Sequence, residues 1–154
     1  MKATKLFLIL IISFSIFNTA CKKDEATICE NLLEQGIANS TSIKGEWEFK
    51  YFAKTINGSK IKNKDEIQKG YINVTDTGTI LLRHTNSVEF KYKLNNSNDI
   101  TMVLTSTTYV NPPPEEKNIC NALNNAICFV VKGNQLLIHY KEIDKRNVLV
   151  LTKK

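Results

Sequence analysis

"WEFKYFAK", residues 47–54, decides the fold, because apolar and charged side chains alternate along it. In an extended chain, one face carries Trp47, Phe49, Tyr51 and Ala53, and the other carries Glu48, Lys50 and Lys54. The stretch "VEFKYKL", residues 88–94, repeats the pattern. Alternation with a period of two over this length indicates β-strands that have one buried face and one solvated face.

Further segments have the composition of strands, and most of the links between them are short, polar and rich in turn-forming residues. They are Gly70–Thr75, Thr79–His84, Asp99–Thr107, Ile127–Lys132, Gln135–Lys141 and Asn147–Thr152. Tight hairpins make neighbouring strands antiparallel, so the simplest topology is a meander. Because closure removes the free edges of a meander, the expected fold is all-β: an eight-stranded antiparallel up-and-down barrel. The charged outer faces argue against insertion of this barrel into a membrane.

Two links are longer than a hairpin turn, and they cover residues 57–68 and 109–126. The three prolines at 112–114 cannot lie in a central strand, and they predict a stiff extended arm. Behind this arm, Ile119–Ala126 is expected to form a short helix or an irregular lid. Long links in compact domains are either functional or without a role, and the sequence leaves both readings open.

The segment before the first strand, "CENLLEQGIAN" at 29–39, predicts a short amphipathic helix that covers one end of the sheet. Its apolar residues at helical spacing are Leu32, Leu33 and Ile37. A short helix followed by "KGEWEFKYF" at 44–52 and a meander of hairpins resembles the lipocalin and wider calycin pattern. The resemblance implies that Gly45 allows a close approach of the chain and that Trp47 packs the closed end of the barrel. The arginine that covers this tryptophan in lipocalins has a weak counterpart in Arg146.

The N-terminus has the features of a secretory signal. Lys2 and Lys5 precede the apolar run Leu6–Phe17, and small or polar residues follow as far as Ala20. The apolar run is shorter than the roughly 20 residues that a membrane-spanning helix needs. A permanent transmembrane helix is therefore the weaker interpretation.

The sequence "FNTACKKDE", residues 17–25, places Cys21 directly after the small residue Ala20. It resembles the lipobox of bacterial lipoproteins, which implies acylation of Cys21, with palmitate-type chains, and anchoring in the outer membrane. The charged residues 22–25 resemble the export signal of surface lipoproteins in Bacteroidetes-type bacteria, so the cell surface is favoured over the periplasmic face. The expected organisation is a signal peptide at 1–20, a lipidated tether with a short helix at 21–43, and a lipocalin-like domain at 44–154.

Composition restricts the class of protein. Removal of residues 1–20 from the 154-residue chain leaves 134 residues, the length of a single domain. Only Lys2 and Lys5 leave as charged residues, so the formal charge falls from +6 to +4. Acidic residues are interspersed among the lysines, and this mixed surface does not indicate nucleic-acid binding.

Four cysteines are present, and three remain when Cys21 is assigned to lipid. An oxidising compartment favours one disulfide among these three. Cys120 and Cys128 are the candidate pair because they close the shortest loop, although a continuous helix between them would hold them about 12 Å apart. Pairing of Cys29 with either one stays open.

Neither histidine belongs to a catalytic or metal-binding motif, so we expect no enzyme, no metal and no cofactor. His139 lies in the alternating segment "LLIHYK" on the solvent side. His84 shares the inner face of its strand with Ile80 and Leu82, at the mouth of the barrel. There it would bind either water or the polar group of a ligand.

Two functional classes remain for a domain that we expect to be monomeric. The first is binding of one small apolar ligand inside the barrel, which is large enough for packed side chains or for one such ligand. Its expected ligand-binding residues are Tyr51, Tyr71, His84, Phe90, Tyr92 and Met102. The second is a surface interaction or inhibitor module that uses the 109–126 loop around a filled core.

Overall fold

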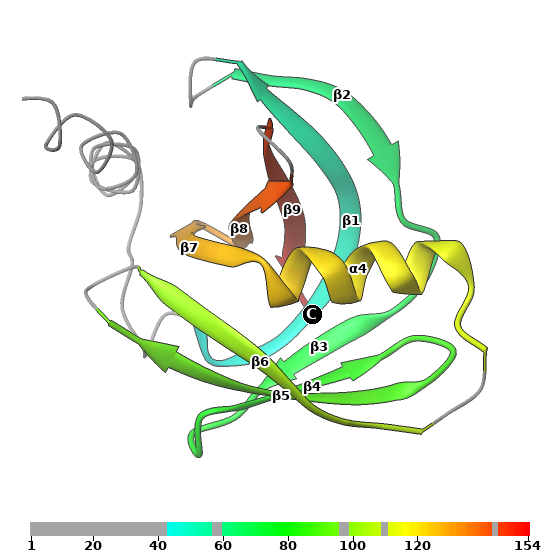
Figure 1. The fold of residues 1–154 in the computed structure, drawn as a ribbon. Helices are drawn as coiled ribbons and strands as arrows, with labels where there is room; N and C mark the ends of the chain where they lie inside the picture. Colours follow the sequence, from blue (N-terminus) through cyan, green and yellow to red (C-terminus); the bar gives the residue numbers. More distant parts are fainter. Residues whose placement is uncertain (1–42, 57–59, 96–98, 109–110, 143–144) are drawn as a thin grey trace, which may run out of the picture.

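The computed structural model describes residues 43–56, 60–95, 99–108, 111–142 and 145–154. A single antiparallel sheet and the helix α4 account for most of this part of the chain (Figure 1). The elements are β1 (Gly45–Ile56), β2 (Lys60–Glu66), β3 (Tyr71–Val74), β4 (Thr79–Arg83), β5 (Ser87–Leu94), β6 (Ile100–Thr107), α4 (Pro114–Asn124), β7 (Ala126–Lys132), β8 (Gln135–Glu142) and β9 (Lys145–Lys153). The predicted N-terminal helix and signal lie outside the described residues.

The sheet has nine strands rather than the predicted eight, because residues 60–66 of the first long link form β2. The strand order is β6-β5-β4-β3-β1-β9-β8-β7, and β2 pairs with the second half of β1. The sheet curls into a half-barrel (Figure 1). Among the described residues its end strands meet at one isolated bridge, between Asp99 and Cys128, so the ladder of hydrogen bonds stays open between β6 and β7.

Helix α4 lies across the open side of this half-barrel (Figure 1). It begins with Pro114 in its first turn, where a missing N–H costs nothing, and it is longer than the predicted segment 119–126. Its buried side chains are Glu116, Ile119, Ala122 and Leu123. The three apolar residues belong to the main core and fill the gap between the two ends of the sheet. No helix among the described residues has the length and apolarity to cross a membrane.

The main core lies between the inner face of the sheet and α4. Trp47 is 1% exposed, and its Nε1 donates a hydrogen bond to the carbonyl oxygen of Ile43 at 2.7 Å. The ammonium of Lys153 lies 4.4 Å from the centroid of the tryptophan ring, so Lys153 covers it. Gly45 has φ +108°, a left-handed conformation, and a Cβ there would lie 2.6 Å from Lys153 Nζ.

A β-bulge in β1 changes which side chains face the core. The register with β9 shifts between Phe49 and Tyr51, so the alternation predicted for 47–54 is interrupted. Phe52 therefore packs against the main core, whereas Tyr51 pairs with Val150 on the opposite face. The prediction that Tyr51 and Ala53 share a face with Trp47 is wrong, because a period of two cannot reveal an inserted residue.

The outer side of β1, β7, β8 and β9 is also buried. Six residues on this side, which we call the outer apolar face, are at most 5% exposed. They are Ala53, Cys128, Val130, His139, Val148 and Val150. They lie in register across the four strands and outside the main core. The expectation of a solvent-facing His139 is therefore wrong, since this half of the sheet has two buried faces.

Candidate functional site

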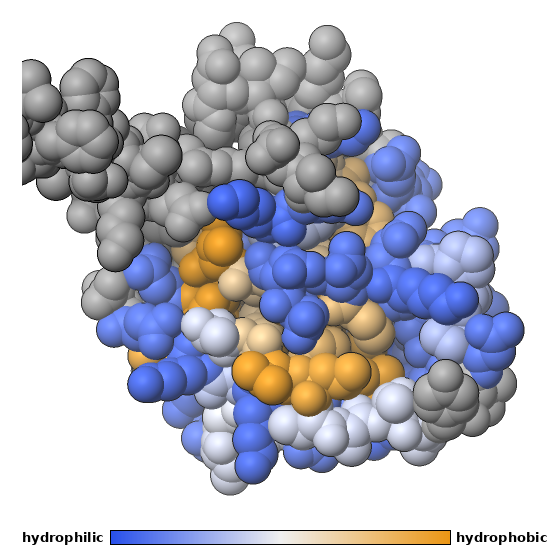
Figure 2. Space-filling view, in the orientation of Figure 1, coloured by the Kyte–Doolittle hydropathy of each residue, from blue (hydrophilic) through white to orange (hydrophobic). Residues whose placement is uncertain are grey.

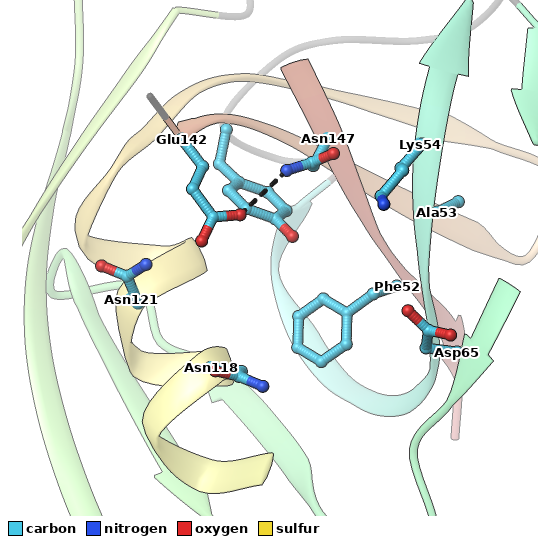
Figure 3. Close-up of a pocket in the computed structure, with 9 residues that line it drawn as sticks. Phe52, Ala53, Lys54, Asp65, Asn118, Asn121, Glu142 and Asn147 are labelled. Atoms are coloured by element: carbon cyan, nitrogen blue, oxygen red, sulfur yellow. Dashed lines mark hydrogen bonds between the residues drawn. The ribbon is translucent and has the colours of Figure 1, made fainter. Parts of the chain in front are cut away.

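A pocket of about 330 Å³ opens beside α4, where the inner face of the sheet changes from apolar to polar (Figure 3). Its lining residues are Phe52, Ala53, Lys54, Asp65, Asn118, Asn121, Tyr140, Glu142 and Asn147. Strand register brings five of them together, because Phe52 pairs with Asp65, and Asn147 pairs with both Lys54 and Tyr140. Residues paired across strands share a face. The volume is in the range of small-ligand sites, about 300–1,000 Å³.

Two aromatic rings form the apolar part of this pocket. Phe52 and Tyr140 meet edge to face, with ring centroids 6.4 Å apart and an interplanar angle of 74°. The bulge in β1 is what turns Phe52 inward. Burial, followed by the nearby charges of Glu142 and Asp65, raises the pKa of Tyr140 to about 12. The phenol is therefore neutral near pH 7 and can donate or accept a hydrogen bond.

Helix α4 supplies two amides to the pocket. Asn118 and Asn121 are three residues apart, so they lie on one face of the helix, and both point toward the pocket (Figure 3). The opposite face of α4 is held in the core. Asn125 Nδ2 donates to Asn121 Oδ1 at 2.8 Å and fixes this side chain at the helix C-terminus. Helix packing thus holds both amides in place, and each offers donors and an acceptor.

A buried acceptor in the pocket lacks a partner. Asn147 is 5% exposed, and its Nδ2 donates to Glu142 Oε2 at 3.1 Å (Figure 3). Its Oδ1 has no hydrogen-bond partner among the described residues. A buried carbonyl oxygen without a donor costs about 1–3 kcal/mol. Asn147 therefore contributes a buried and unpaired acceptor among the residues that line the pocket.

The charges around the pocket are mixed. Lys54 and Asp65 are exposed at its β1–β2 side, and Glu142 lies at its β8 side. One cation and two carboxylates do not favour an anionic ligand. No cluster of three or more metal-ligating side chains occurs among the described residues. The arrangement can bind a compact molecule through ring contacts and several hydrogen bonds.

His84 lies away from this pocket, in the turn between β4 and β5. Its Nε2 lies 2.8 Å from Glu115 Oε1, its Nδ1 lies 3.3 Å from Glu116 Oε2, and its side chain is 9% exposed. His84 lies directly after β4 and beside the turn, as the sequence predicted. The two expected partners, water or a ligand, are replaced by carboxylates from the first turn of α4. His84 thus helps to hold α4 on the sheet.

Glu116 is the centre of this attachment and is 1% exposed. Its carboxylate accepts hydrogen bonds from the backbone N–H of Thr85 at 2.9 Å, the backbone N–H of Asn86 at 3.0 Å, and Asn86 Nδ2 at 2.6 Å. Burial raises the pKa of Glu116, but these hydrogen bonds and the charge of His84 outweigh burial and leave the pKa lowered. Sequence reasoning missed this residue, because a glutamate after three prolines has no local signal of burial.

The other residues predicted to bind a ligand do not line this pocket. Phe90 and Met102 are buried in the main core, and Tyr92 packs against it. Tyr71 is half-buried on the outer side of β3, with Lys154 Nζ 4.2 Å from its ring centroid, because Ile72 and Val74 occupy the inner side. None of the three core residues lines the pocket.

The predicted bridge between Cys120 and Cys128 is not formed. Cys120 is a free thiol on α4, and burial, with the charge of Glu116, raises its pKa to about 11. Cys128 is disulfide-bonded, and its partner lies outside the described residues. The physical reason is orientation: Cys120 packs against the main core, whereas Cys128 belongs to the outer apolar face.

No local pattern in the sequence predicts the pocket residues on α4, β8 and β9. Asn118 and Asn121 share a face of α4, but their spacing predicts a site only when it is known which face of the helix packs against the sheet. Asn147 and Glu142 meet through the β8–β9 pairing, which brings together residues five positions apart. Local patterns do not reveal such contacts.

The fold is a curled antiparallel half-barrel with a helix across its open side. In structure the chain is similar to a crystal structure of a DUF4847 family protein from Bacteroides vulgatus ATCC 8482, with a TM-score of 0.59 and 18% sequence identity. The alignment covers 72% of this chain and 93% of that chain. No protein-family model matches the chain, and no curated protein matches it. The likeness shows the fold alone.

Proposed function

We propose that this chain is an exported lipoprotein, anchored through acylated Cys21 at the outer surface of the outer membrane, whose lipocalin-like domain binds a small molecule. The observation that carries the binding proposal is the pocket beside α4, with its unpartnered Asn147 Oδ1. The proposal is for binding and not for catalysis.

The anchor proposal is supported by the sequence around Cys21. An apolar run, a small residue and a cysteine stand in the order that lipoprotein processing requires, and charged residues follow directly. Each buried methylene of an acyl chain contributes about 0.8 kcal/mol, and two or more chains give stable attachment.

Replacement of Cys21 with serine is expected to move the protein from the membrane fraction to the soluble exported fraction. The reason is loss of the thiol that carries the lipid. Fractionation of cells that express the full chain, with metabolic labelling by palmitate, measures this change. Cys120→Ser, at a thiol that the structure places in the domain, serves as the control and should stay in the membrane fraction. Palmitate incorporation that persists in the Cys21→Ser variant would contradict the anchor.

The pocket lining fits a neutral hydroxylated ring, such as a saccharide unit, better than a purely apolar ligand. The rings of Phe52 and Tyr140 can pack against apolar C–H groups, and the amides of Asn118 and Asn121 can pair with hydroxyls. Three of the residues that were expected to surround an apolar ligand, Phe90, Tyr92 and Met102, pack in or against the core instead. We therefore place the ligand beside α4 and not inside the barrel.

Phe52→Ala is expected to weaken binding of such a ligand about five- to twelvefold, because loss of one ring contact costs about 1–1.5 kcal/mol. The measurement is chemical-shift titration of the domain with a panel of neutral mono- and oligosaccharides. Val103→Ala, on exposed β6, is the matched control and should leave affinity unchanged. If no saccharide in the panel binds, the proposal that the ligand is a saccharide is wrong. If Phe52→Ala and the parent domain bind with equal affinity, the ligand does not bind in this pocket.

The alternative function, a surface interaction module, is favoured by one observation. Val103 and Leu104 are 56% and 46% exposed on β6, an end strand of the sheet. Figure 2 shows apolar residues gathered along β6, below the polar outer face of α4. Such an edge can contact a partner protein. A Val103→Asp variant that loses a captured partner but retains saccharide binding would support this function.

A further inference from the structure

The lining of the pocket beside α4 carries an excess of negative charge. Asp65 contributes to it from β2 and Glu142 from β8, and Figure 3 shows these two carboxylates on opposite sides of the pocket. Lys54 on β1 is the cation among the described lining residues, so carboxylates outnumber cations two to one. A neutral ring can use the amides and aromatic rings of this lining, but it gains nothing from the net charge.

Neither carboxylate is neutralised by a cation of the described structure. Within the described parts of the chain, Asp65 and Glu142 form no ion pair. The hydrogen bond to Glu142 Oε2 comes from the uncharged amide of Asn147, at 3.1 Å. Both carboxylate side chains are exposed, so a molecule in the pocket can reach them.

The two negative charges act on the same hydroxyl group. The pKa of Tyr140 is raised first by burial and then by the charges of Glu142 and Asp65. A carboxylate raises the pKa of a phenol because it disfavours the phenolate, so both carboxylates make the potential at this hydroxyl negative. The same potential attracts a positive charge. The neutral phenol oxygen also offers an acceptor to a ligand ammonium group.

We propose that this pocket selects, among hydroxylated rings, those that carry one protonated amine, as an amino sugar does. Glu142 and Asp65 determine this specificity by attracting the ammonium group from the two sides of the pocket. The inference rests on the proposed function, because it names the ligand class of the same pocket. Specificity is a difference between two affinities, so the reference is a neutral sugar of the same ring shape.

The charge of the whole protein opposes this preference. The formal net charge of the chain is +6, so the protein as a whole repels a cationic sugar and attracts an anionic one. Non-specific attraction therefore cannot produce tighter binding of an amino sugar. A measured preference for the protonated amine would have to come from groups in the pocket.

Chemical-shift titration of the full exported chain with glucosamine, glucose and N-acetylglucosamine at about pH 6 tests the selection. The amine of glucosamine is protonated at this pH, whereas the other two sugars are neutral. The affinity for glucosamine should exceed the affinity for either neutral sugar about three- to fivefold, the gain expected from exposed ion pairs. Equal affinities for the three sugars would overturn this inference and leave the proposed function standing. If none of the sugars binds, the proposed function fails, and the inference fails with it.

Variants that remove charge but keep shape test the two carboxylates. A Glu142→Gln, Asp65→Asn double variant should bind glucosamine and glucose with equal affinity, and its glutamine still offers an acceptor to Asn147 Nδ2. Each single variant should lose part of the preference, which keeps the test decisive if the double variant does not fold. Glu89→Gln removes the same charge from β5, outside the pocket lining, and should keep the full preference. A full preference in the folded double variant, or its loss in Glu89→Gln, would overturn the inference.

Discussion

Replacing Glu116 with alanine is expected to lower the free energy of unfolding by about 3–5 kcal/mol, the usual cost of removing one partner from a buried charged network. The substitution removes the acceptor for Thr85 N–H, Asn86 N–H and Asn86 Nδ2, and it leaves buried donors without partners. It also frees the first turn of α4 from the β4–β5 turn. Urea unfolding followed by tryptophan fluorescence and circular dichroism measures the change.

Glu115 provides the matched control for this substitution. Its side chain is 30% exposed, and its closest contact is the 2.8 Å hydrogen bond with His84 Nε2. Glu115→Ala should therefore cost only about 1 kcal/mol. Equal losses for the two variants would show that burial of Glu116 does not matter, and would contradict the described attachment of α4.

The same carboxylate predicts an acid limit on stability. Its pKa in the folded protein is lowered below the ordinary value of 4.5, so its contribution to stability is complete above about pH 4.5 and is lost as pH falls through the folded-state pKa. His84, Glu115 and Cys120 are the other titratable groups around it. Glu116→Gln should flatten the fall in unfolding free energy below pH 4.5. If the unfolding free energy of Glu116→Gln falls as steeply with pH as that of the parent protein, groups other than Glu116 cause the acid sensitivity.

Replacement of Trp47 with alanine is the second large effect, with an expected loss of about 3–5 kcal/mol in the free energy of unfolding. Trp47 is among the largest fully buried side chains, and its substitution removes ring contacts in the main core and the hydrogen bond to Ile43. Lys153 would lose the ring that it covers. Because the chain has one tryptophan, unfolding of this variant must be followed by circular dichroism.

Trp47→Phe separates packing from hydrogen bonding at this site. A phenyl ring keeps most of the apolar volume but has no N–H, so the carbonyl of Ile43 loses its donor. The expected cost is about 1–2 kcal/mol. If the free energy of unfolding of Trp47→Ala is within about 1 kcal/mol of that of the parent protein, Trp47 does not make the core contacts described above.

Strand positions could be predicted from the sequence because period-two alternation is a local property. Inner residues such as Trp47, Phe49 and Phe90 are where the alternation places them. Alternation failed after Lys50, where the bulge in β1 inserts a residue and moves Tyr51 to the outer side. It also failed for His139, because in a strand that is buried on both faces a polar residue can be buried, and the alternation then no longer indicates which side chains are exposed.

The candidate site was less predictable than the fold. Helix α4 was expected as a short helix or lid, but its role in filling the gap between β6 and β7 depends on where the sheet ends in space. The pocket joins Phe52, Asn121 and Asn147 from three elements. Their proximity follows from the register of β1, β8 and β9 and from the packing of α4, which no local pattern encodes.

The sequence by itself determined that this protein is an antiparallel β domain with a tryptophan at the start of its first strand, because side-chain alternation and turn residues act over a few neighbouring positions. Only the tertiary structure decided that the sheet stays open between β6 and β7, that Glu116 joins α4 to the sheet, and that a polar pocket lies beside that helix. These features depend on contacts between residues far apart in the chain, where register, bulges and burial select the partners.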